Sequence, residues 1–208
     1  MTNSRIRSAA LQSKIMSAED AAALKKQDVT TVTPEITNSV ERLMRRVEDF
    51  PTDGVQFCDL TPVLANAEGF DAVVDGLMAG HEIGTIDYVA GLDARGFLLA
   101  GAVAVRLHTG VLAIRKAGKL PPPVHSRSYE LEYGAATLEL PADGLELRGK
   151  RVLVVDDVLA TGGTLGAAVG LLDDCGAVVA GLSVILEVPG LGGRDRLSGT
   201  PLTCLTVA

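Results

Sequence analysis

A run of apolar residues that ends in two adjacent acids constrains this chain more than any other feature. The segment from Val152 to Val155 shows no polar alternation, which is typical of a parallel strand buried on both faces. An unpaired charge is costly inside such a layer, so Asp156 and Asp157 are predicted to lie where the strand leaves the core, at its carboxyl end. In open α/β sheets this is the end at which ligands bind.

A turn rich in glycine and threonine follows the two acids. Thr161, Gly162, Gly163 and Thr164 precede an apolar helical pattern at 165–172. Backbone N–H groups at a helix N-terminus favour an anion, and glycine lets that anion approach closely. Neighbouring carboxylates suit the hydroxyls of a vicinal diol or a divalent metal, so the string indicates a sugar phosphate site. The structural alternative is a helix cap followed by a tight Gly-Gly turn.

Composition limits the class of protein. A chain of 208 residues is long enough for one domain with a sizeable core, and 47% hydrophobic with 3% aromatic residues predicts an aliphatic core. Nineteen basic against 26 acidic side chains give a net charge of −7, which argues against a nucleic-acid binder. No apolar run approaches the length of a membrane span, so no membrane partner is expected.

The cysteines and histidines form no recognisable ligand set. Three widely spaced cysteines give neither a disulfide framework nor a zinc pattern, which favours a reducing compartment and a cytoplasmic location. The three histidines are interpreted as ordinary surface or partly buried residues. Residues 1–18 carry three basic residues, four serines and no acid, faintly like a transit peptide. We interpret residues 1–33 instead as an N-terminal arm without fixed structure.

Strands that alternate with helices predict a mostly parallel twisted sheet flanked by helices, an α/β fold. The helices are expected at 34–48, 69–83, 94–107 and from 165, and the strands at 87–92, 111–115, 137–140 (a brief edge strand), 151–156, 178–187 and 202–207. The stretch 116–132 has no evident structure of its own. Its mixed charges suit either a lid over an anionic substrate or a solvated loop.

Several strings resemble a known family. Residues 152–164 resemble the phosphoribosyl pyrophosphate signature of the type I phosphoribosyltransferases. Three further strings resemble one branch, the adenine phosphoribosyltransferases: Asp49-Phe50-Pro51 through Phe57-Cys58-Asp59-Leu60-Thr61; Gly91-Leu92-Asp93-Ala94-Arg95-Gly96-Phe97; and Arg115-Lys116-Ala117-Gly118-Lys119-Leu120-Pro121 with Tyr129-Glu130-Leu131-Glu132-Tyr133-Gly134. The resemblance covers residues 35–195. It implies a phosphoribosyltransferase domain at 34–208, with a hood at 34–66 for the base and a flexible lid at 116–134.

The resemblance also implies where the donor, 5-phosphoribosyl 1-pyrophosphate, would bind. The segment Ala160-Thr161-Gly162-Gly163-Thr164 would hold the 5′-phosphate, and Asp156 with Asp157 would contact the ribose hydroxyls. The Asp93-Ala94-Arg95 loop, often with a non-proline cis peptide in such enzymes, would present N–H groups to pyrophosphate. Arg115 and Lys119 would neutralise pyrophosphate, with a homodimer allowing one of them to act across the interface. Mg²⁺ would be held mainly by the substrate rather than by protein ligands.

For the base, the resemblance implies a slot in the hood. Phe57 and Val158 would lie on the two faces of adenine, and backbone groups of Gln56 and Cys58 would read its edge. On the lid, Glu132 would hydrogen-bond a purine nitrogen, and Tyr133 would contact substrate. Glu132, Arg95 and Lys119 are therefore the implied catalytic residues. Cys58 stands where the family usually has Arg, so a guanidinium that held the lid or pyrophosphate would be lost with a cost in activity. Gln56 stands where an aliphatic residue is common, a change that bears on the base slot.

The expected activity is synthesis of AMP and pyrophosphate from adenine and the donor, a purine salvage reaction. Two alternatives remain open at this point. The first is the same chemistry on another purine base. The second is a non-catalytic sensor of phosphoribosyl pyrophosphate that regulates transcription, which the acidic charge balance and the absence of a helix-turn-helix pattern disfavour.

Overall fold

The chain folds around one seven-stranded sheet. The computed structural model describes residues 32–131 and 134–208, so the expected arm at 1–33 falls almost wholly outside the described residues. The strand order is β5-β6-β4-β3-β7-β8-β9. These strands are β3 (Tyr88–Leu92), β4 (Gly110–Lys116), β5 (Val124–Leu131), β6 (Gly134–Pro141), β7 (Arg151–Leu159), β8 (Val178–Glu187) and β9 (Leu202–Val207). Neighbours within β4-β3-β7-β8-β9 are parallel, whereas β6 is antiparallel to both β4 and β5. The predicted mostly parallel sheet is confirmed.

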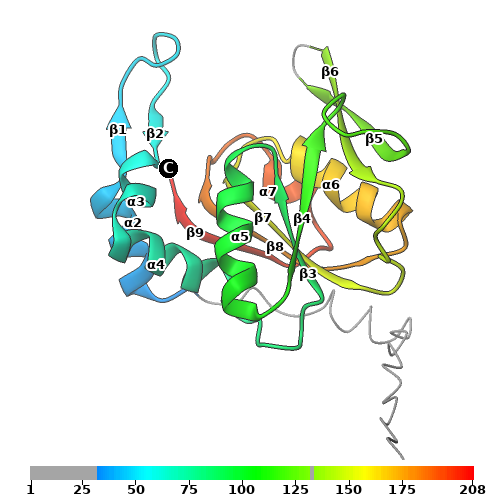
Figure 1. Ribbon diagram of the computed structural model, residues 1–208. Coiled ribbons are helices and arrows are strands. Elements are labelled where there is room, and N and C mark those ends of the chain that lie inside the picture. The colour runs from blue at the N-terminus through cyan, green and yellow to red at the C-terminus, as the bar shows by residue number, and fades with distance from the viewer. Residues whose placement is uncertain (1–31, 132–133) are drawn as a thin grey trace, which may run out of the picture.

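Helices cover both faces of the sheet (Figure 1). One buried cluster joins the sheet to α4 (Ala67–Leu77) and α5 (Arg95–Leu107). The other joins the opposite face to α6 (Gly163–Asp174) and to the segment around α7 (Gly193–Arg196). Both clusters are built mainly from Leu, Val, Ile and Ala, as the aliphatic composition predicts. None of the helices within residues 32–131 and 134–208 combines the length and hydropathy that crossing a membrane needs.

The hood is a small unit beside β9. It consists of α2 (Pro34–Leu43), β1 (Arg45–Val47), β2 (Phe57–Asp59) and α3 (Thr61–Ala65), with β1 and β2 paired antiparallel. Two side-chain bonds fasten α2 to the last strand: Thr37 Oγ1 donates to the carbonyl of Leu205 at 2.8 Å, and Thr206 Oγ1 donates to Glu41 Oε1 at 2.8 Å. The hood is therefore held to the sheet at its β9 edge.

Three predictions for β elements were wrong. The strand expected to stop at Asp156 continues to Leu159, because β8 keeps pairing with it through Leu159↔Glu187. The stretch 116–132 is not without structure, since its second half forms β5 and pairs with β6 from Val124↔Pro141 to Leu131↔Gly134. The expected edge strand is longer than predicted and lies inside the sheet, between β5 and β4.

Two helix boundaries were also wrong. The first helix ends at Leu43 rather than at residue 48, because the chain becomes extended at Met44 and enters β1. The second begins at Ala67, where the Asn66 side chain accepts a hydrogen bond from Gly69 N at 2.8 Å, and ends at Leu77. An N-cap of this kind is visible in the sequence only as one asparagine among several.

The contact between α5 and β3 depends on a glycine. A methyl group at Gly91 of β3 would lie 2.8 Å from Ala100 Cβ and would overlap the carbonyl of Gly96, both on α5. We expect Gly91→Ala to destabilise the fold by about 1–3 kcal/mol, which is typical of overpacking. Chemical denaturation measures this loss. Gly166→Ala on α6 is the matched control, since its methyl would make only an ordinary 3.7 Å contact, and equal behaviour of the two variants would contradict the packing argument.

Candidate active site

Two adjacent carboxylates lie near the carboxyl end of β7. Asp157 is buried, with 7% of its surface exposed, and Asp156 is partly buried. The backbone N–H of Asp157 donates to Asp156 Oδ1 at 2.9 Å. Arg95 Nε lies 2.6 Å from Asp157 Oδ2, but that oxygen has no well-aligned hydrogen bond among the described residues. The pair therefore keeps acceptor capacity for a ligand that brings its own donors.

The environment of Asp156 opposes its ionisation. Burial first, and the neighbouring Asp157 carboxylate second, raise the pKa of Asp156 to about 8. Two close carboxylates in a poorly hydrated place resist holding two negative charges. Gly96, at the start of α5, lies directly over this place, since a methyl group there would lie 3.1 Å from Asp156 Oδ1. The free site therefore retains a proton that a hydroxyl donor or cation would displace.

The turn after β7 exposes backbone donors at the start of α6. Gly162 has φ +75° and is the N-cap, and as a glycine it has no side chain to accept from the first N–H groups of this helix. Gly193 packs against the turn from the other side: a methyl group there would overlap the Ala160 carbonyl, and one at Gly162 would lie 2.8 Å from the Gly193 carbonyl oxygen. Thr161 and Thr164 are partly buried beside these amides. The arrangement can accept an anion.

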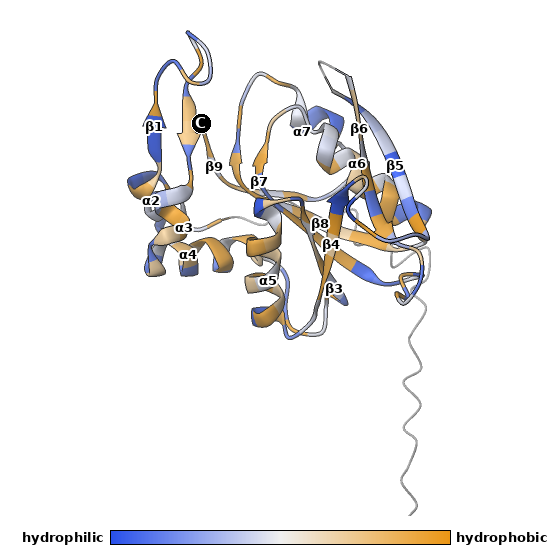
Figure 2. Cartoon of the chain, turned by 45° about the horizontal axis from the view of Figure 1, so that its top comes forward, coloured by the Kyte–Doolittle hydropathy of each residue, from blue (hydrophilic) through white to orange (hydrophobic). Residues whose placement is uncertain are grey.

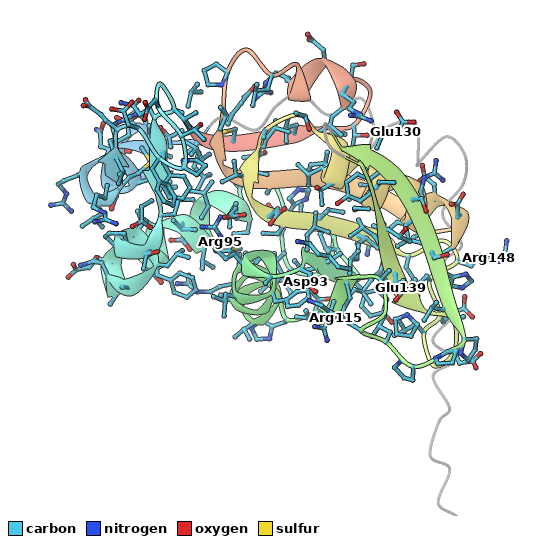
Figure 3. All side chains as sticks on the ribbon, turned by 90° about the horizontal axis from the view of Figure 1, so that it is seen from above. Asp93, Arg95, Arg115, Glu130, Glu139 and Arg148 are labelled. Atoms are coloured by element: carbon cyan, nitrogen blue, oxygen red, sulfur yellow. The ribbon has the colours of Figure 1, made fainter. Side chains whose placement is uncertain are left out.

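The Asp93–Arg95 loop follows β3, next to β7 in the sheet. The Asp93–Ala94 peptide bond is cis, as the resemblance implies. Arg115 Nε and Lys119 Nζ lie 3.5 Å and 3.2 Å from Asp93 Oδ2, and Figure 3 shows Asp93 and Arg115 together beside α5. Burial of Asp93 would raise its pKa, but the hydrogen bond and charge of Lys119, together with hydrogen bonds from the Lys116 backbone and from Arg115, leave the pKa lowered. Arg115 and Lys119, which were predicted to neutralise pyrophosphate, thus both lie beside the Asp93 carboxylate of the same chain.

In the hood, the predicted base residues lie on and beside β2. The rings of Phe57 and Phe50 meet edge to face with centroids 5.1 Å apart. Cys58 is buried, and Arg46 Nη1, its neighbour across the β1–β2 pair, lies 3.8 Å from its sulfur. Val158 packs against the buried cluster that contains Cys58, so β7 and the hood share one apolar contact region. Gln56 is exposed.

Two of the predicted site residues cannot be placed. Glu132 and Tyr133 lie outside the described residues. Conversely, sequence reasoning missed three residues around the glycine turn. Gly193 supports the turn, Arg196 Nη1 would lie 3.7 Å from a methyl group on Gly163, and the Tyr129 hydroxyl lies 3.3 Å from Thr164 Oγ1. For Tyr129, the alternating pattern of β5 is the one sequence signal that could have indicated its position. Gly193 and Arg196 lie in α7, which carries no motif that would have indicated them.

The described residues form no complete protein site for a metal. No group of three His, Cys, Asp or Glu side chains suited to a metal lies within the described ranges. The two aspartates of β7 nevertheless provide hard oxygen ligands, one of them with the unsatisfied atom Oδ2. This donor set fits Mg²⁺ that takes most of its ligands from a phosphorylated substrate and water.

The raised pKa of Asp156 predicts a pH-dependent stability. The folded state holds a proton that the unfolded chain has lost between roughly pH 4 and pH 8, so stability falls as pH rises through this window. The side chain introduced by Asp156→Asn cannot ionise, so the melting temperature of this variant should exceed that of the wild type more at pH 8 than at pH 5. The expected difference is about 2–4 °C for each kcal/mol of unfolding free energy that the wild type loses between these two pH values. Thermal melts at both pH values measure this difference. The exposed Asp143→Asn is the control, and a pH-independent difference for Asp156→Asn would contradict the interpretation.

Comparison with known proteins agrees with this geometry. A family model described as "Phosphoribosyl transferase domain" matches residues 64–202. An adenine phosphoribosyltransferase of Nocardia farcinica is 55% identical over 188 residues, covering 90% of this chain and 97% of that protein. One from Corynebacterium diphtheriae is 61% identical over 161 residues, covering 77% and 88%.

Solved structures lead to the same family. The crystal structure of adenine phosphoribosyltransferase from Rhodothermus marinus matches with a TM-score of 0.77 and 37% identity, covering 85% of this chain and 100% of that one. A Trypanosoma brucei structure in complex with AMP, pyrophosphate and ribose-5-phosphate has a TM-score of 0.73 and 26% identity, covering 86% and 82%. With the acid pair and the glycine turn both in place, the chain belongs to the adenine phosphoribosyltransferases, enzymes of the phosphoribosyl transferase domain family.

Proposed function

We propose that this site transfers the 5-phosphoribosyl group of 5-phosphoribosyl 1-pyrophosphate to adenine, giving AMP and pyrophosphate. The observation that carries the proposal is the acid pair of β7 followed directly by the uncapped N-terminus of α6. This spacing matches a sugar that carries two hydroxyls and a phosphate. The named relatives act on adenine, and the Trypanosoma brucei relative binds AMP, pyrophosphate and ribose-5-phosphate.

The donor is oriented by the two ends of this motif. The α6 amides and the hydroxyls of Thr161 and Thr164 hold the 5′-phosphate, and Asp156 with Asp157 accept hydrogen bonds from the ribose hydroxyls. Bound Mg²⁺ supplies positive charge to the pyrophosphate oxygens. The acid pair also stabilises the positive charge that grows on the ribose ring as the bond to pyrophosphate breaks, because fixed anions near a developing cation lower its energy.

The leaving pyrophosphate needs positive partners. Backbone N–H groups of the Asp93–Arg95 loop and the side chains of Arg95, Arg115 and Lys119 provide them in this proposal. Arg115 and Lys119 now contact Asp93, so they exchange one anion for another as the donor binds. Both cations therefore stay near the leaving pyrophosphate, on which negative charge develops.

Adenine enters from the hood side. Phe57 and Val158 sandwich its ring, and main-chain groups of Gln56 and Cys58 read its edge; the proximity of the hood to β7 supports this. Glu132, with Tyr133 beside it in the sequence, holds or accepts the purine proton as a base nitrogen bonds to the anomeric carbon. The segment 116–134 serves as the lid that excludes water, which would otherwise capture the reactive sugar cation.

The acid pair gives the direct test. The wild-type protein should form AMP from adenine, Mg²⁺ and the donor. Asp156→Asn with Asp157→Asn should raise the KM for the donor by about 10²-fold or more, since two hydrogen bonds to charged groups are lost, with little change in the KM for adenine.

Initial-rate kinetics with each substrate varied separates these effects, and a panel of purine bases at fixed donor defines the base range. Asp143→Asn, at an exposed position away from the acid pair in the sequence, is the control for loss of a surface carboxylate. Equal losses for both substrates would contradict the diol assignment, and no AMP from the wild type would contradict the function.

We also propose that the enzyme acts as a homodimer in the cytoplasm. Free thiols at Cys58, Cys175 and Cys204 support a reducing compartment. For the dimer, the support is an apolar stripe on α5 that faces away from the core. Leu98 and Val105 expose 63% and 77% of their surface, at a helical spacing that puts them on one side. Figure 2 shows hydrophobic residues along α5, and β4 beside it adds Val111, 46% exposed. Such patches mark interfaces.

Disrupting this stripe should give a monomer. The wild type is expected at twice the chain mass of 21.6 kDa, and Val105→Glu, which places a charge at the interface, at the chain mass itself. Light scattering coupled to size-exclusion chromatography measures both. Ile83→Glu is the control, because Ile83 is similarly exposed, at 64%, but lies on the loop before β3 rather than on α5. A dimer that survives Val105→Glu would exclude this face.

A further inference from the structure

Strand β5, part of the proposed lid, directly contacts the turn at Ala160–Thr164 that is proposed to hold the 5′-phosphate. Tyr129 of β5 places its hydroxyl 3.3 Å from Thr164 Oγ1, in a partly buried position. Its ring covers the start of α6, since a methyl group on Gly163 would lie 3.4 Å from Tyr129 Cδ2 and 3.6 Å from the Glu130 carbonyl oxygen. The first turn of α6 therefore has the lid hairpin as its neighbour, in addition to β7 and α7.

A second contact fixes the same strand farther along the helix. Arg127 lies two residues before Tyr129 and so faces the same way along β5. Its Nη1 donates to Asp174 Oδ2 at 2.7 Å and to the Gly170 carbonyl at 3.3 Å. Gly170 makes room for this side chain, since a methyl group there would lie 2.9 Å from Arg127 Cδ and would overlap the guanidinium. Strand β5 is thus fastened near both ends of α6.

The hydroxyl pair has a directional consequence. A threonine hydroxyl has one hydrogen to donate and can accept through its oxygen. When Tyr129 donates to Thr164 Oγ1, the single Thr164 hydrogen has to point elsewhere, and the open α6 N-terminus beside it is where an anion binds. A phosphate dianion only accepts hydrogen bonds, so its binding favours the orientation in which the Thr164 hydrogen points toward it.

We propose that Tyr129 is a positioning residue for the 5′-phosphate, acting through Thr164. Its hydroxyl donates to Thr164 and aims the Thr164 hydrogen at the phosphate, so that the β5–β6 hairpin and the donor site are coupled. The inference rests on the proposed function and deepens it: the lid strand contributes to binding of the phosphorylated sugar. No proton leaves either residue in this role, and Tyr129 touches no reacting atom.

The test removes one oxygen atom. Tyr129→Phe keeps the ring and should raise the KM for the donor by about three- to tenfold, the size of one neutral hydrogen bond, with the KM for adenine unchanged. Inhibition by ribose 5-phosphate should weaken by the same factor, while inhibition by pyrophosphate stays as in the wild type. Tyr88→Phe is the matched control: Tyr88 begins β3, at the opposite end of the strands from the turn, and should leave all four constants unchanged.

A double-mutant cycle shows whether the effect runs through Thr164. In a Thr164→Val background, Tyr129→Phe should add no further loss for ribose 5-phosphate, because the partner hydroxyl is already absent. Additive losses, or a wild-type donor KM for Tyr129→Phe, would overturn the inference. Equal weakening of ribose 5-phosphate and pyrophosphate would also overturn it, since that pattern means general loosening of the lid. Failure of the wild type to make AMP would instead reject the proposed function itself.

Discussion

The placement of β7 between β3 and β8 is the constraint on which the rest of the structure depends. Parallel pairing on both sides buries Val152 to Val155 completely and brings the ends of β3 and β7 to the same edge of the sheet. The acid pair and the glycine turn follow one another in the sequence, and the Asp93–Arg95 loop, from a distant part of the chain, lies at the same edge. The chemistry therefore follows from strand register.

Charge in the free site is balanced between close partners. Arg95 lies against Asp157, while Arg115 and Lys119 lie against Asp93. Each of these cations already has an anion, so in the proposed function a polyanionic donor takes the place of a carboxylate that is present before it binds. The gain in affinity is smaller than the number of new ion pairs suggests, because the existing pairs must first separate. The existing ion pairs also preorganise the site, because they hold the charged groups in place before the substrate binds.

Much of this site could be predicted from the sequence, because its parts are local. A buried strand, two acids and a glycine turn lie within residues 152–164, and the strand-loop-helix order follows from hydrophobic periodicity. The stretch 116–132 was wrongly predicted to lack secondary structure, because β5 is an edge strand whose mostly polar residues give no apolar strand pattern. The contacts of Gly193, Arg196 and Tyr129 were missed because they depend on how α7 and β5 pack against α6. No local pattern encodes such packing.

The attachment of α2 to β9 has a practical meaning for anyone who handles this protein. The chain ends beside the hood, as Figure 1 shows, and the last residue still donates its N–H to the Glu187 carbonyl at 2.9 Å. An affinity handle fused after Ala208 would therefore start beside the end of β8 and near the hood (Figure 1). Purification or immobilisation chemistry is better attached elsewhere, and spectroscopic probes placed near residue 208 would report on the side of the molecule where base binding is proposed.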